Sequence, residues 1–494
     1  MSYIEFNHNR LEITDGPFQP TWESLRQYQC PEWFRDAKFG IWAHWGPQVV
    51  PKAGDWYARN MYIEGSDQYN YHIKTFGHPS KFGYKDIIKR WKAENFEPDT
   101  IMKLCKKMGV QYFTALAVHH DNFDCWNSKH HDWNSVKKGP GKDIVGMWKD
   151  AARKEDMRFG ITEHLERSYS WFNTNKGYDK VGQYAGIPYD GNDPQYEGLY
   201  FESHTDHNYG YPTNPSNKFV EQWYMRIKDV VENYNPDVIY MDGGVPFGEV
   251  GRAMIANYYN HNILCHNGNL EAVHLIKDVN NIFTDVHHGE YVDGIATLDV
   301  ERGAIENIRD EPWQCDTYIN DWFYNQFMKY KPIRHMIHLL IDTVSKNGCL
   351  LFSIPLLPDG TLDDECLQIM GEITEWISIN GEGIFSTRPW KIYGEGPTLA
   401  TTGAYNEEEV KFTPLDFRFT QKGNIVYAFC MEWPDNKKLL IKSFAADGKN
   451  DKISSVELLG YGGKLEWSQD VDGLRISLPD EKPCNFAWTL RIRS

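Results

Sequence analysis

The sequence predicts an α/β protein with a (β/α)8-like barrel followed by a small C-terminal β-sandwich. Short apolar runs that end in polar residues alternate with helix-like segments over most of the chain, which is typical of parallel strands joined by helices. The 494 residues exceed the roughly 250 that such a barrel usually takes. Near residue 398 the pattern changes to short strands with Gly and Asp turns. We therefore expect a barrel domain over residues 1–395 and a β-sandwich domain over 396–494.

The strand ends are the most informative part of the barrel. Apolar runs at 39–43, 112–118, 159–162, 236–241 and 263–265 end, in that order, at His44, His119-His120, Glu163-His164, Asp242 and His266-Asn267. In a (β/α)8 barrel the carboxyl ends of the strands surround one pocket, and catalytic residues lie there. The sequence therefore predicts one polar site at this end. The alternative for Asp242 is a helix N-cap at a strand-to-helix turn.

Helices, a long loop and C-terminal strands complete the prediction. Helices are expected at 99–108, 142–154, 217–234 and 363–379, and short C-terminal strands at 410–413, 425–429, 439–441, 456–459 and 474–478. Residues 173–216 are rich in Asn, Gly, Tyr, Asp and Pro and show little periodicity. We expect them to form a long loop that contributes to the pocket wall.

The composition limits the kinds of partner. The net charge is −17 and the pI is about 5.5, so nucleic acid and anionic membranes are poor partners, because both need a basic face. Aromatic residues make up 15% of the chain, with 18 Trp and 29 Tyr, which suits stacking on sugar rings. A Trp-rich core is the alternative explanation.

The cysteines and the amino terminus bear on the compartment. The nine cysteines are scattered and form no Cys-x-x-Cys pair, which argues against a disulfide framework and against a thiolate zinc site. The first eight residues contain no apolar signal region, and no run approaches the roughly 18 apolar residues of a membrane span. We expect a soluble protein, cytoplasmic as it stands, or periplasmic or secreted if a leader has been removed.

Several blocks, in register along the chain, resemble glycoside hydrolase family 29, the α-L-fucosidase family. They are Trp33–Gly46, His119–Phe123, Asp237–Gly243, Ser345–Gly348, Pro358–Thr361, Asn380–Glu382 and Thr387–Trp390. The resemblance implies a retaining exo-glycosidase that acts on terminal α-L-fucosyl residues of an oligosaccharide or glycoconjugate and needs no cofactor. The oligomeric state stays open.

The resemblance also implies roles for individual residues. Asp242 would be the nucleophile and Tyr240 would stand beside it. His44, His119 and His120 would bind the sugar hydroxyls, and Trp56 would contact the ring. We also predict that Asp55 and Glu163, which depart from the family pattern, bind the sugar. Adjacent histidines on a strand point to opposite faces, and no metal-ligand spacing accompanies them, so we predict no metal site.

Glycoside cleavage needs a second carboxyl group, which protonates the leaving oxygen. In the family it follows the nucleophile at a variable distance, and 298–303, followed by 312–315, is the best match. We therefore predict Glu301 as the acid/base, with Glu290 as the rival. For either residue, a solvated loop glutamate is the alternative.

This chain departs from the family pattern at four places. Asp55 replaces a Glu, Glu163-His164 stand where a Tyr wall is common, 265–269 lacks an Arg after the fifth predicted strand, and Gln314 stands where a Glu is common. A polar group near C6 would favour a sugar with an extra hydroxyl. The alternative substrate is therefore an α-L-galactoside or α-L-glucoside, and a non-catalytic sugar-binding protein is a further alternative.

Overall fold

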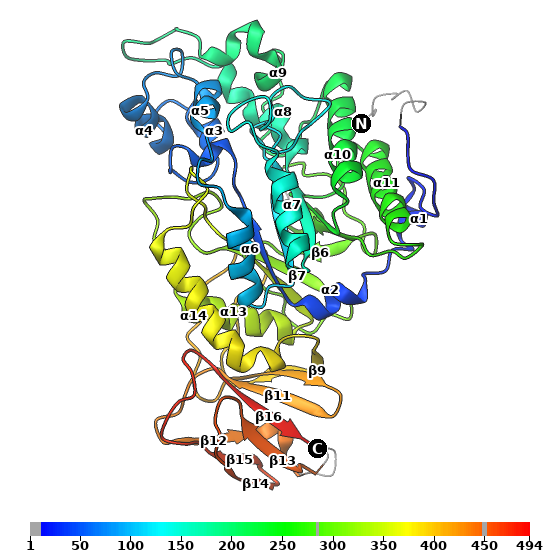
Figure 1. Cartoon of the computed structure of the whole chain (residues 1–494), viewed down its shortest axis with the longest axis vertical. Coiled ribbons are helices and arrows are strands. Elements are labelled where there is room, and N and C mark those ends of the chain that lie inside the picture. Colours follow the sequence, from blue (N-terminus) through cyan, green and yellow to red (C-terminus); the bar gives the residue numbers. More distant parts are fainter. Residues whose placement is uncertain (1–10, 283–285, 447–451) are drawn as a thin grey trace.

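The computed structural model describes residues 11–282, 286–446 and 452–494. The prediction made for the first eight residues lies outside this part of the chain. Within it, eight parallel strands close into a barrel, and antiparallel sheets follow at the C-terminal end of the molecule (Figure 1). The predicted fold class is confirmed.

The barrel strands pair in chain order, and the last pairs with the first. They are β1 (Phe39–Ala43), β2 (Tyr112–Val118), β3 (Arg158–Glu163), β4 (Val238–Met241), β5 (Val273–Lys277), β6 (Thr297–Asp299), β7 (Trp313–Tyr318) and β8 (Gly348–Ser353). Every residue of β1, β2, β4 and β5 is buried. Strands with both faces covered are nearly continuous apolar runs, which explains why β1 to β4 could be found in the sequence.

The interpretation of 263–265 as a strand is wrong. These residues form the last turn of helix α11 (Glu249–Cys265), and strand β5 begins eight residues later at Val273. A short apolar run cannot be assigned to a strand or a buried helix from periodicity alone. The correction matters because strand five ends at Lys277, so its polar terminal group is a cation.

Longer helices cover the outside of the barrel (Figure 1). They are α6 (Pro98–Lys107), α7 (Ile144–Lys154), α10 (Asn217–Tyr234), α11, α13 (Ile333–Ser345) and α14 (Asp364–Asn380). The side chain of Ser216 caps α10 by accepting a hydrogen bond from the backbone N–H of Phe219, and Asn235 ends it with φ 48°. The four predicted helices are confirmed with shifts of one or two residues at most.

Shorter helices lie in the loops. They are α1 (Trp22–Leu25), α2 (Glu32–Ala37), α3 (Tyr57–Asn60), α4 (Asp67–Thr75), α5 (Tyr84–Arg90), α8 (Ser168–Trp171), α9 (Glu197–Tyr200) and α12 (Val279–Ile282). The predicted loop at 173–216 contains α9 and single 3-10 turns, and otherwise it is irregular. Among the described residues, no helix has both the length and the apolar composition needed to cross a membrane.

The C-terminal part consists of two antiparallel sheets around one core. The five-stranded sheet has the order β13 (Ser455–Leu458), β16 (Trp488–Arg493), β11 (Ile425–Cys430), β10 (Phe417–Lys422) and β9 (Arg388–Glu395), and the smaller sheet has the order β12 (Lys438–Ile441), β15 (Gly473–Ser477) and β14 (Glu466–Asp470). Residues of both sheets form a shared apolar cluster. Of the predicted strands, 410–413 is not one. The division at residue 395 stays a prediction, and β9, just before it, pairs with β10.

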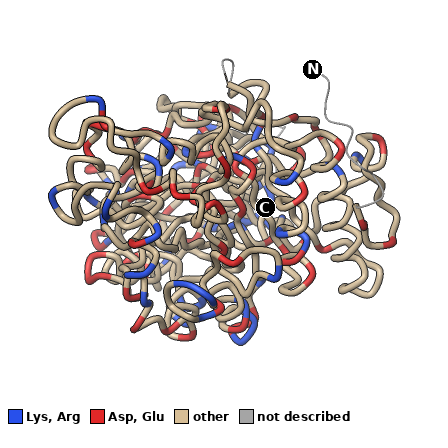
Figure 2. Tube along the Cα trace, turned by 90° about the horizontal axis from the view of Figure 1, so that it is seen from above, with Lys and Arg blue, Asp and Glu red and all other residues tan. Residues whose placement is uncertain are grey.

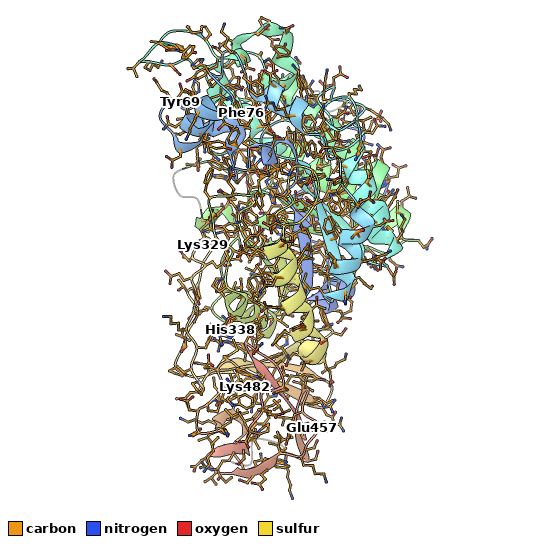
Figure 3. The ribbon with its side chains drawn as sticks, turned by 60° about the vertical axis from the view of Figure 1, so that its left-hand side comes forward. Tyr69, Phe76, Lys329, His338, Glu457 and Lys482 are labelled. Atoms are coloured by element: carbon orange, nitrogen blue, oxygen red, sulfur yellow. The ribbon has the colours of Figure 1, made fainter. Side chains whose placement is uncertain are left out.

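A buried ion pair joins the C-terminal sheets to the barrel. Arg418 of β10 donates from Nε to Asp342 of α13 at 2.5 Å, and Lys346 pairs with the other carboxylate oxygen at 2.8 Å. On the same helix, the ring of His338 lies 3.1 Å from the carbonyl oxygen of Phe486. Figure 3 places His338 above the C-terminal sheets. Helix α13 therefore connects the barrel to the C-terminal sheets through these contacts.

We predict that Arg418→Ala destabilises the protein because it removes one partner of this buried pair. The expected loss in the free energy of unfolding is about 3 kcal/mol, at the lower end of the range for a broken buried pair, since Lys346 still neutralises Asp342. Urea unfolding measures it. Arg475→Ala is the control, because that arginine pairs with Asp470 on the exposed surface and should change little. Equal losses in both variants would contradict the assignment.

Candidate active site

One cavity lies at the carboxyl ends of the barrel strands. Its volume is about 380 Å³, and it is lined by Trp42, His44, Asp55, Trp56, His119, His120, His164, Arg167, Tyr209, Tyr240, Asp242, His288, Glu301, Arg302, Tyr318, Asp321, Trp322 and Tyr405. Tyr209 comes from the long loop, as predicted for the pocket wall. The predicted site residues all line this cavity except Glu163.

Glu163 is buried behind the cavity wall. It is fully inaccessible to solvent, and one carboxylate oxygen accepts a hydrogen bond from the backbone N–H of Leu165 at 3.1 Å. Burial raises the pKa of Glu163 to about 7 and that of the neighbouring Glu166 well above its usual range. The next residue, His164, lines the cavity instead, because Glu163 is the last residue of β3 and side chains alternate along a strand. The expectation that His119 and His120 point to opposite faces is wrong: both follow the end of β2 at Val118, and both line the cavity.

Asp242 is surrounded by two cations and by imidazole rings. One carboxylate oxygen forms an ion pair with Lys277, and the other lies 3.4 Å from Nη1 of Arg167 and 3.3 Å from Nε2 of His120. Burial alone would raise the pKa of Asp242, but Lys277 and Arg167 hold it well below its usual range. The two cations therefore favour the ionised carboxylate.

Glu301 contacts the same lysine from the other side. Its carboxylate forms an ion pair with Nζ of Lys277, the same nitrogen that pairs with Asp242. Two charge-assisted hydrogen bonds that share one nitrogen span at most about 6 Å, so the nearest oxygens of Glu301 and Asp242 lie within about 6 Å of each other. The rival Glu290 does not line the cavity. Its side chain is 40% exposed and pairs with Arg252 at 3.6 Å. The geometry therefore favours Glu301.

Lys277, like Arg167 and Tyr405, is a site residue that the sequence analysis missed. Its side chain is fully buried at the end of β5. Burial alone would lower the pKa of Lys277, but Asp242 and Glu301 raise it well above its usual range. The ammonium form is thus held between two carboxylates. The signal that could have found it is the run Val-His-Leu-Ile-Lys at 273–277, which ends in a polar residue like the other barrel strands.

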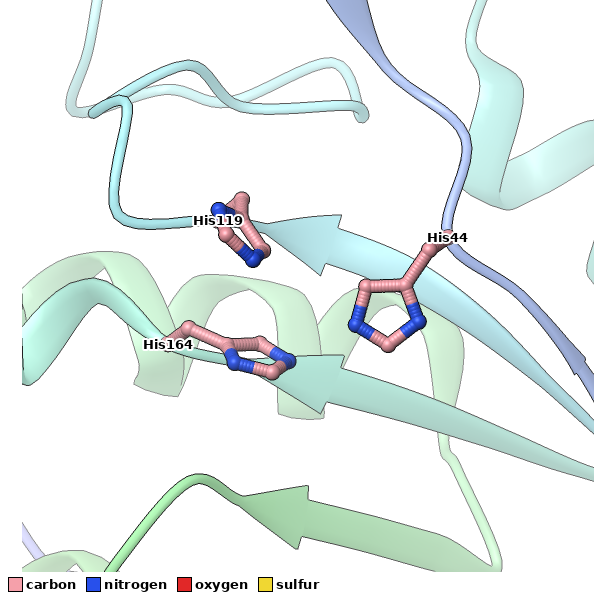
Figure 4. Close-up of side chains that lie close together, drawn as sticks. All are labelled: His44, His119 and His164. Atoms are coloured by element: carbon pink, nitrogen blue, oxygen red, sulfur yellow. The ribbon is translucent and has the colours of Figure 1, made fainter. Parts of the chain in front are cut away.

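Three imidazoles extend the site along the ends of β1, β2 and β3. Figure 4 shows His44, His119 and His164 facing one another, and their ring nitrogens lie within 4.8 Å, close enough to hold a metal ion. The hydrogen bonds of Gln48 argue against a metal ion at this position. Its oxygen accepts from the backbone N–H of Ala58, so its amide nitrogen donates to Nδ1 of His119 at 2.8 Å. Nε2 of His119 then carries the proton, which leaves no lone pair for a metal and suits a hydroxyl group.

A second group of possible ligands consists of His120, His164 and Asp242. Nδ1 of His120 donates to the carbonyl oxygen of His164 at 2.7 Å. The charge of Asp242 is already matched by Lys277 and Arg167. A divalent cation here would be repelled by both cations at short range, so this group also fits a polar organic ligand better than a metal.

Aromatic side chains close the remaining wall. Trp56 adopts φ 61° and packs its ring 4.9 Å from Tyr209, and the guanidinium of Arg167 lies 5.9 Å from the Trp56 ring. The rings of Trp42 and Trp322 pack edge to face at 5.1 Å. Flat apolar surfaces beside hydrogen-bonding groups are what a sugar ring requires, since it has apolar faces and a polar rim.

Two carboxyl groups that face one small, partly aromatic cavity can cleave a glycosidic bond, and this chemistry defines a glycoside hydrolase. The comparison with protein families specifies which kind. A family model described as "Alpha-L-fucosidase" matches residues 6–382, and one described as "Alpha-L-fucosidase C-terminal domain" matches residues 411–493. The chain belongs to the alpha-L-fucosidase family.

Named relatives cover nearly the whole chain. Human tissue alpha-L-fucosidase is 27% identical over 491 residues, which is 96% of this chain and 91% of the relative. Human plasma alpha-L-fucosidase is 27% identical over 496 residues, 96% of this chain and 92% of the relative. A solved structure of Thermotoga maritima alpha-fucosidase in complex with fucose has a TM-score of 0.71 at 25% identity and covers 96% of this chain and 99% of its own.

We predict that Lys277→Met moves the acid limb of the pH profile of kcat/KM to higher pH. Lys277 helps to hold the pKa of Asp242 below its usual range, so removal of this charge raises the pKa, and the carboxylate is protonated at a pH where the native site is still ionised. The profile is measured with an activated aryl fucoside. Lys154→Met, at an exposed pair with Asp99, is the control. An acid limb that stays in place in Lys277→Met would contradict this role.

Proposed function

We propose that the protein is a retaining α-L-fucosidase that releases terminal α-L-fucosyl residues from oligosaccharides or glycoconjugates, with Asp242 as the nucleophile and Glu301 as the acid/base. The observation that carries the proposal is the shared lysine. Lys277 binds both carboxylates, which places them at a separation compatible with the roughly 5–5.5 Å of retaining enzymes. Membership of the alpha-L-fucosidase family supports the choice of sugar.

Two solved relatives support the retaining course. One is a Bacteroides thetaiotaomicron alpha-L-fucosidase described as a trapped covalent intermediate, with a TM-score of 0.63 at 15% identity over 99% of each chain. The other is the Thermotoga maritima enzyme in complex with a mechanism-based inhibitor, with a TM-score of 0.73 at 24% identity over 97% of this chain and 100% of its own. At these identities the similarity shows that the fold is shared. We propose the covalent intermediate for this protein by analogy with these two relatives.

The reaction follows from the charges on the three groups. The proposed reaction starts from the form in which Glu301 has taken up a proton from solvent, so that Lys277 then pairs with the Asp242 carboxylate alone. In the first step, Glu301 gives this proton to the leaving oxygen, the bond from this oxygen to C1 breaks, and Asp242 bonds to C1. Asp242 then becomes a neutral ester, and Lys277 pairs with the new Glu301 carboxylate. In the second step, Glu301 takes a proton from water, whose oxygen attacks C1 and releases Asp242. Lys277 thus has one carboxylate partner throughout.

The histidines bind the hydroxyl groups of the sugar in this proposal. Burial lowers the pKa of His44 well below its usual range and that of His120 to about 3, so both rings are neutral. A neutral imidazole donates with one nitrogen and accepts with the other, which matches a hydroxyl group. Trp56 lies against the sugar ring.

The choice between fucose and a 6-hydroxylated sugar depends on what faces C6. The sequence argument for an extra hydroxyl relied on Glu163 and His164. The carboxyl group of Glu163 lies outside the cavity lining, whereas His164 lines it. The argument for an α-L-galactoside or α-L-glucoside therefore loses its carboxylate, and membership of the alpha-L-fucosidase family favours the fucoside as the proposed substrate.

We predict that an aryl α-L-fucoside is the best substrate in a panel with the matching α-L-galactoside and α-L-glucoside, because the chain belongs to the alpha-L-fucosidase family and Glu163 does not reach the cavity to bind a C6 hydroxyl. Specificity constants are compared for the native protein. His44→Ala, which removes a hydroxyl-binding group, should lower kcat/KM more than tenfold, since tenfold corresponds to about 1.4 kcal/mol. A preference for the galactoside would reject the fucosidase proposal while leaving the two-carboxylate mechanism intact.

Azide should rescue Glu301→Ala on an activated aryl fucoside. The nitrophenyl group leaves without a proton, so the glycosyl-enzyme accumulates and a small anion can attack it without a general base. The expected product is a fucosyl azide of retained configuration, detected by NMR. Glu290→Ala is the matched control and should behave like the native protein. Rescue in Glu290→Ala, with native behaviour in Glu301→Ala, would reverse the assignment.

A further inference from the structure

A segment from beyond the barrel crosses the barrel mouth. Residues 401–408, here called the strap, follow β9 and precede β10 in the chain. The strap pairs with the loop that carries Glu301: the backbone N–H of Tyr405 donates to the carbonyl oxygen of Glu301 at 2.7 Å, and that of Gly403 donates to Ala304 at 2.8 Å. Part of the active-site wall therefore comes from a segment on the C-terminal side of the predicted domain boundary.

Ion pairs fix the far end of the strap to the barrel. The carboxylate of Glu407 accepts from Nζ of Lys331 at 2.6 Å, from Oγ1 of Thr317 at 2.5 Å, and lies 2.7 Å from Nε2 of His335. Burial alone would raise the pKa of Glu407, but His335 and Lys331 lower it to about 2. The carboxylate stays ionised, so the anchor holds over the whole working range of pH.

Close packing fixes the near end. A Cβ on Gly303 would lie 2.1 Å from the carbonyl oxygen of Gly403, which is a severe steric clash. Glycine at 303 is therefore what allows the strap to approach the Glu301 loop. The strap is held at both ends, which means that the residue between them has a defined position.

That residue is Tyr405, and its backbone is strained. Its φ is 62°, a left-handed conformation that costs a non-glycine residue roughly 1–2 kcal/mol. The conformation turns the ring into the cavity, where its hydroxyl lies 3.3 Å from Nζ of Lys277. The side chain remains 37% exposed at the cavity mouth. Strain that the surrounding contacts maintain is typical of functional positions.

We propose that Tyr405 forms the wall of the leaving-group subsite, where its ring packs against the sugar or aryl group on the far side of the scissile bond. Glu301 delivers its proton to the leaving oxygen, so the groups beside Glu301 face the leaving group rather than the fucosyl ring. The fucosyl ring is bound on the opposite side by His44 and its neighbours on β1–β3. The ligand class is a pyranose or aryl group with an exposed apolar face. This inference rests on the proposed function.

Three substrates separate this role from its alternatives. α-L-Fucosyl fluoride has no ring in the leaving group and needs little acid assistance. A 4-nitrophenyl fucoside has a ring but also needs little assistance, and an α-L-fucosyl-galactose disaccharide has a ring and needs the acid. In Tyr405→Ala, kcat/KM should fall for both ring-bearing substrates by about tenfold more than for the fluoride, mainly through KM. Tyr405→Phe should keep at least half of the native ratio, because it keeps the ring.

Tyr461→Ala is the matched control, because Tyr461 is also 37% exposed but lies in the C-terminal part, away from the cavity. It should leave all three ratios unchanged. A selective loss on the disaccharide alone in Tyr405→Ala would mean that the residue acts through Glu301, and equal losses on all three substrates, or no loss, would also overturn the subsite. If the native protein fails to hydrolyse the fluoride, the fucosidase proposal itself fails, which is a different result.

Discussion

The active site depends on one buried ammonium shared by two carboxylates. An unpaired lysine in this position would lose its charge, and two unpaired carboxylates would repel each other. Lys277 therefore requires Asp242 and Glu301 to converge on it, and this limits the distance between the two groups that we propose as nucleophile and acid/base. Each of the three comes from a different barrel strand or strand-end loop, so the closed barrel is what makes their meeting possible.

The rest of the cavity is consistent with this charge balance. Buried histidines stay neutral, as the lowered pKa of His120 indicates, so they add hydrogen-bonding capacity without adding charge. Arg167 gives Asp242 a second cation at 3.4 Å, which favours the ionised nucleophile before a bond to the sugar forms. Seen from above, the trace carries Lys and Arg interspersed with Asp and Glu (Figure 2), and the net charge of −17 disfavours a polyanionic substrate.

The sequence predicted the barrel and several of the cavity residues because buried parallel strands are apolar runs with conspicuous polar ends. It failed at strand five, where a short apolar run belongs to the end of α11 and the actual strand ends in Lys277. It identified none of the strands β6 to β8. It also failed at Glu163, because a shift of one residue at a strand end turns a side chain from the cavity to the interior. The role of Tyr405 could not be predicted, since its position depends on pairing across about a hundred residues of chain.

The most direct test of this account is covalent labelling of the nucleophile. Incubation with 2-deoxy-2-fluoro-α-L-fucosyl fluoride slows the second step, so the glycosyl-enzyme should accumulate, and peptide mapping by mass spectrometry should locate the label on Asp242. The label should disappear when the protein turns over in the presence of an acceptor. A label on Glu301 or on any other carboxylate, or steady turnover with inversion and no label, would contradict the central claim that Lys277 holds an ionised nucleophile opposite its acid.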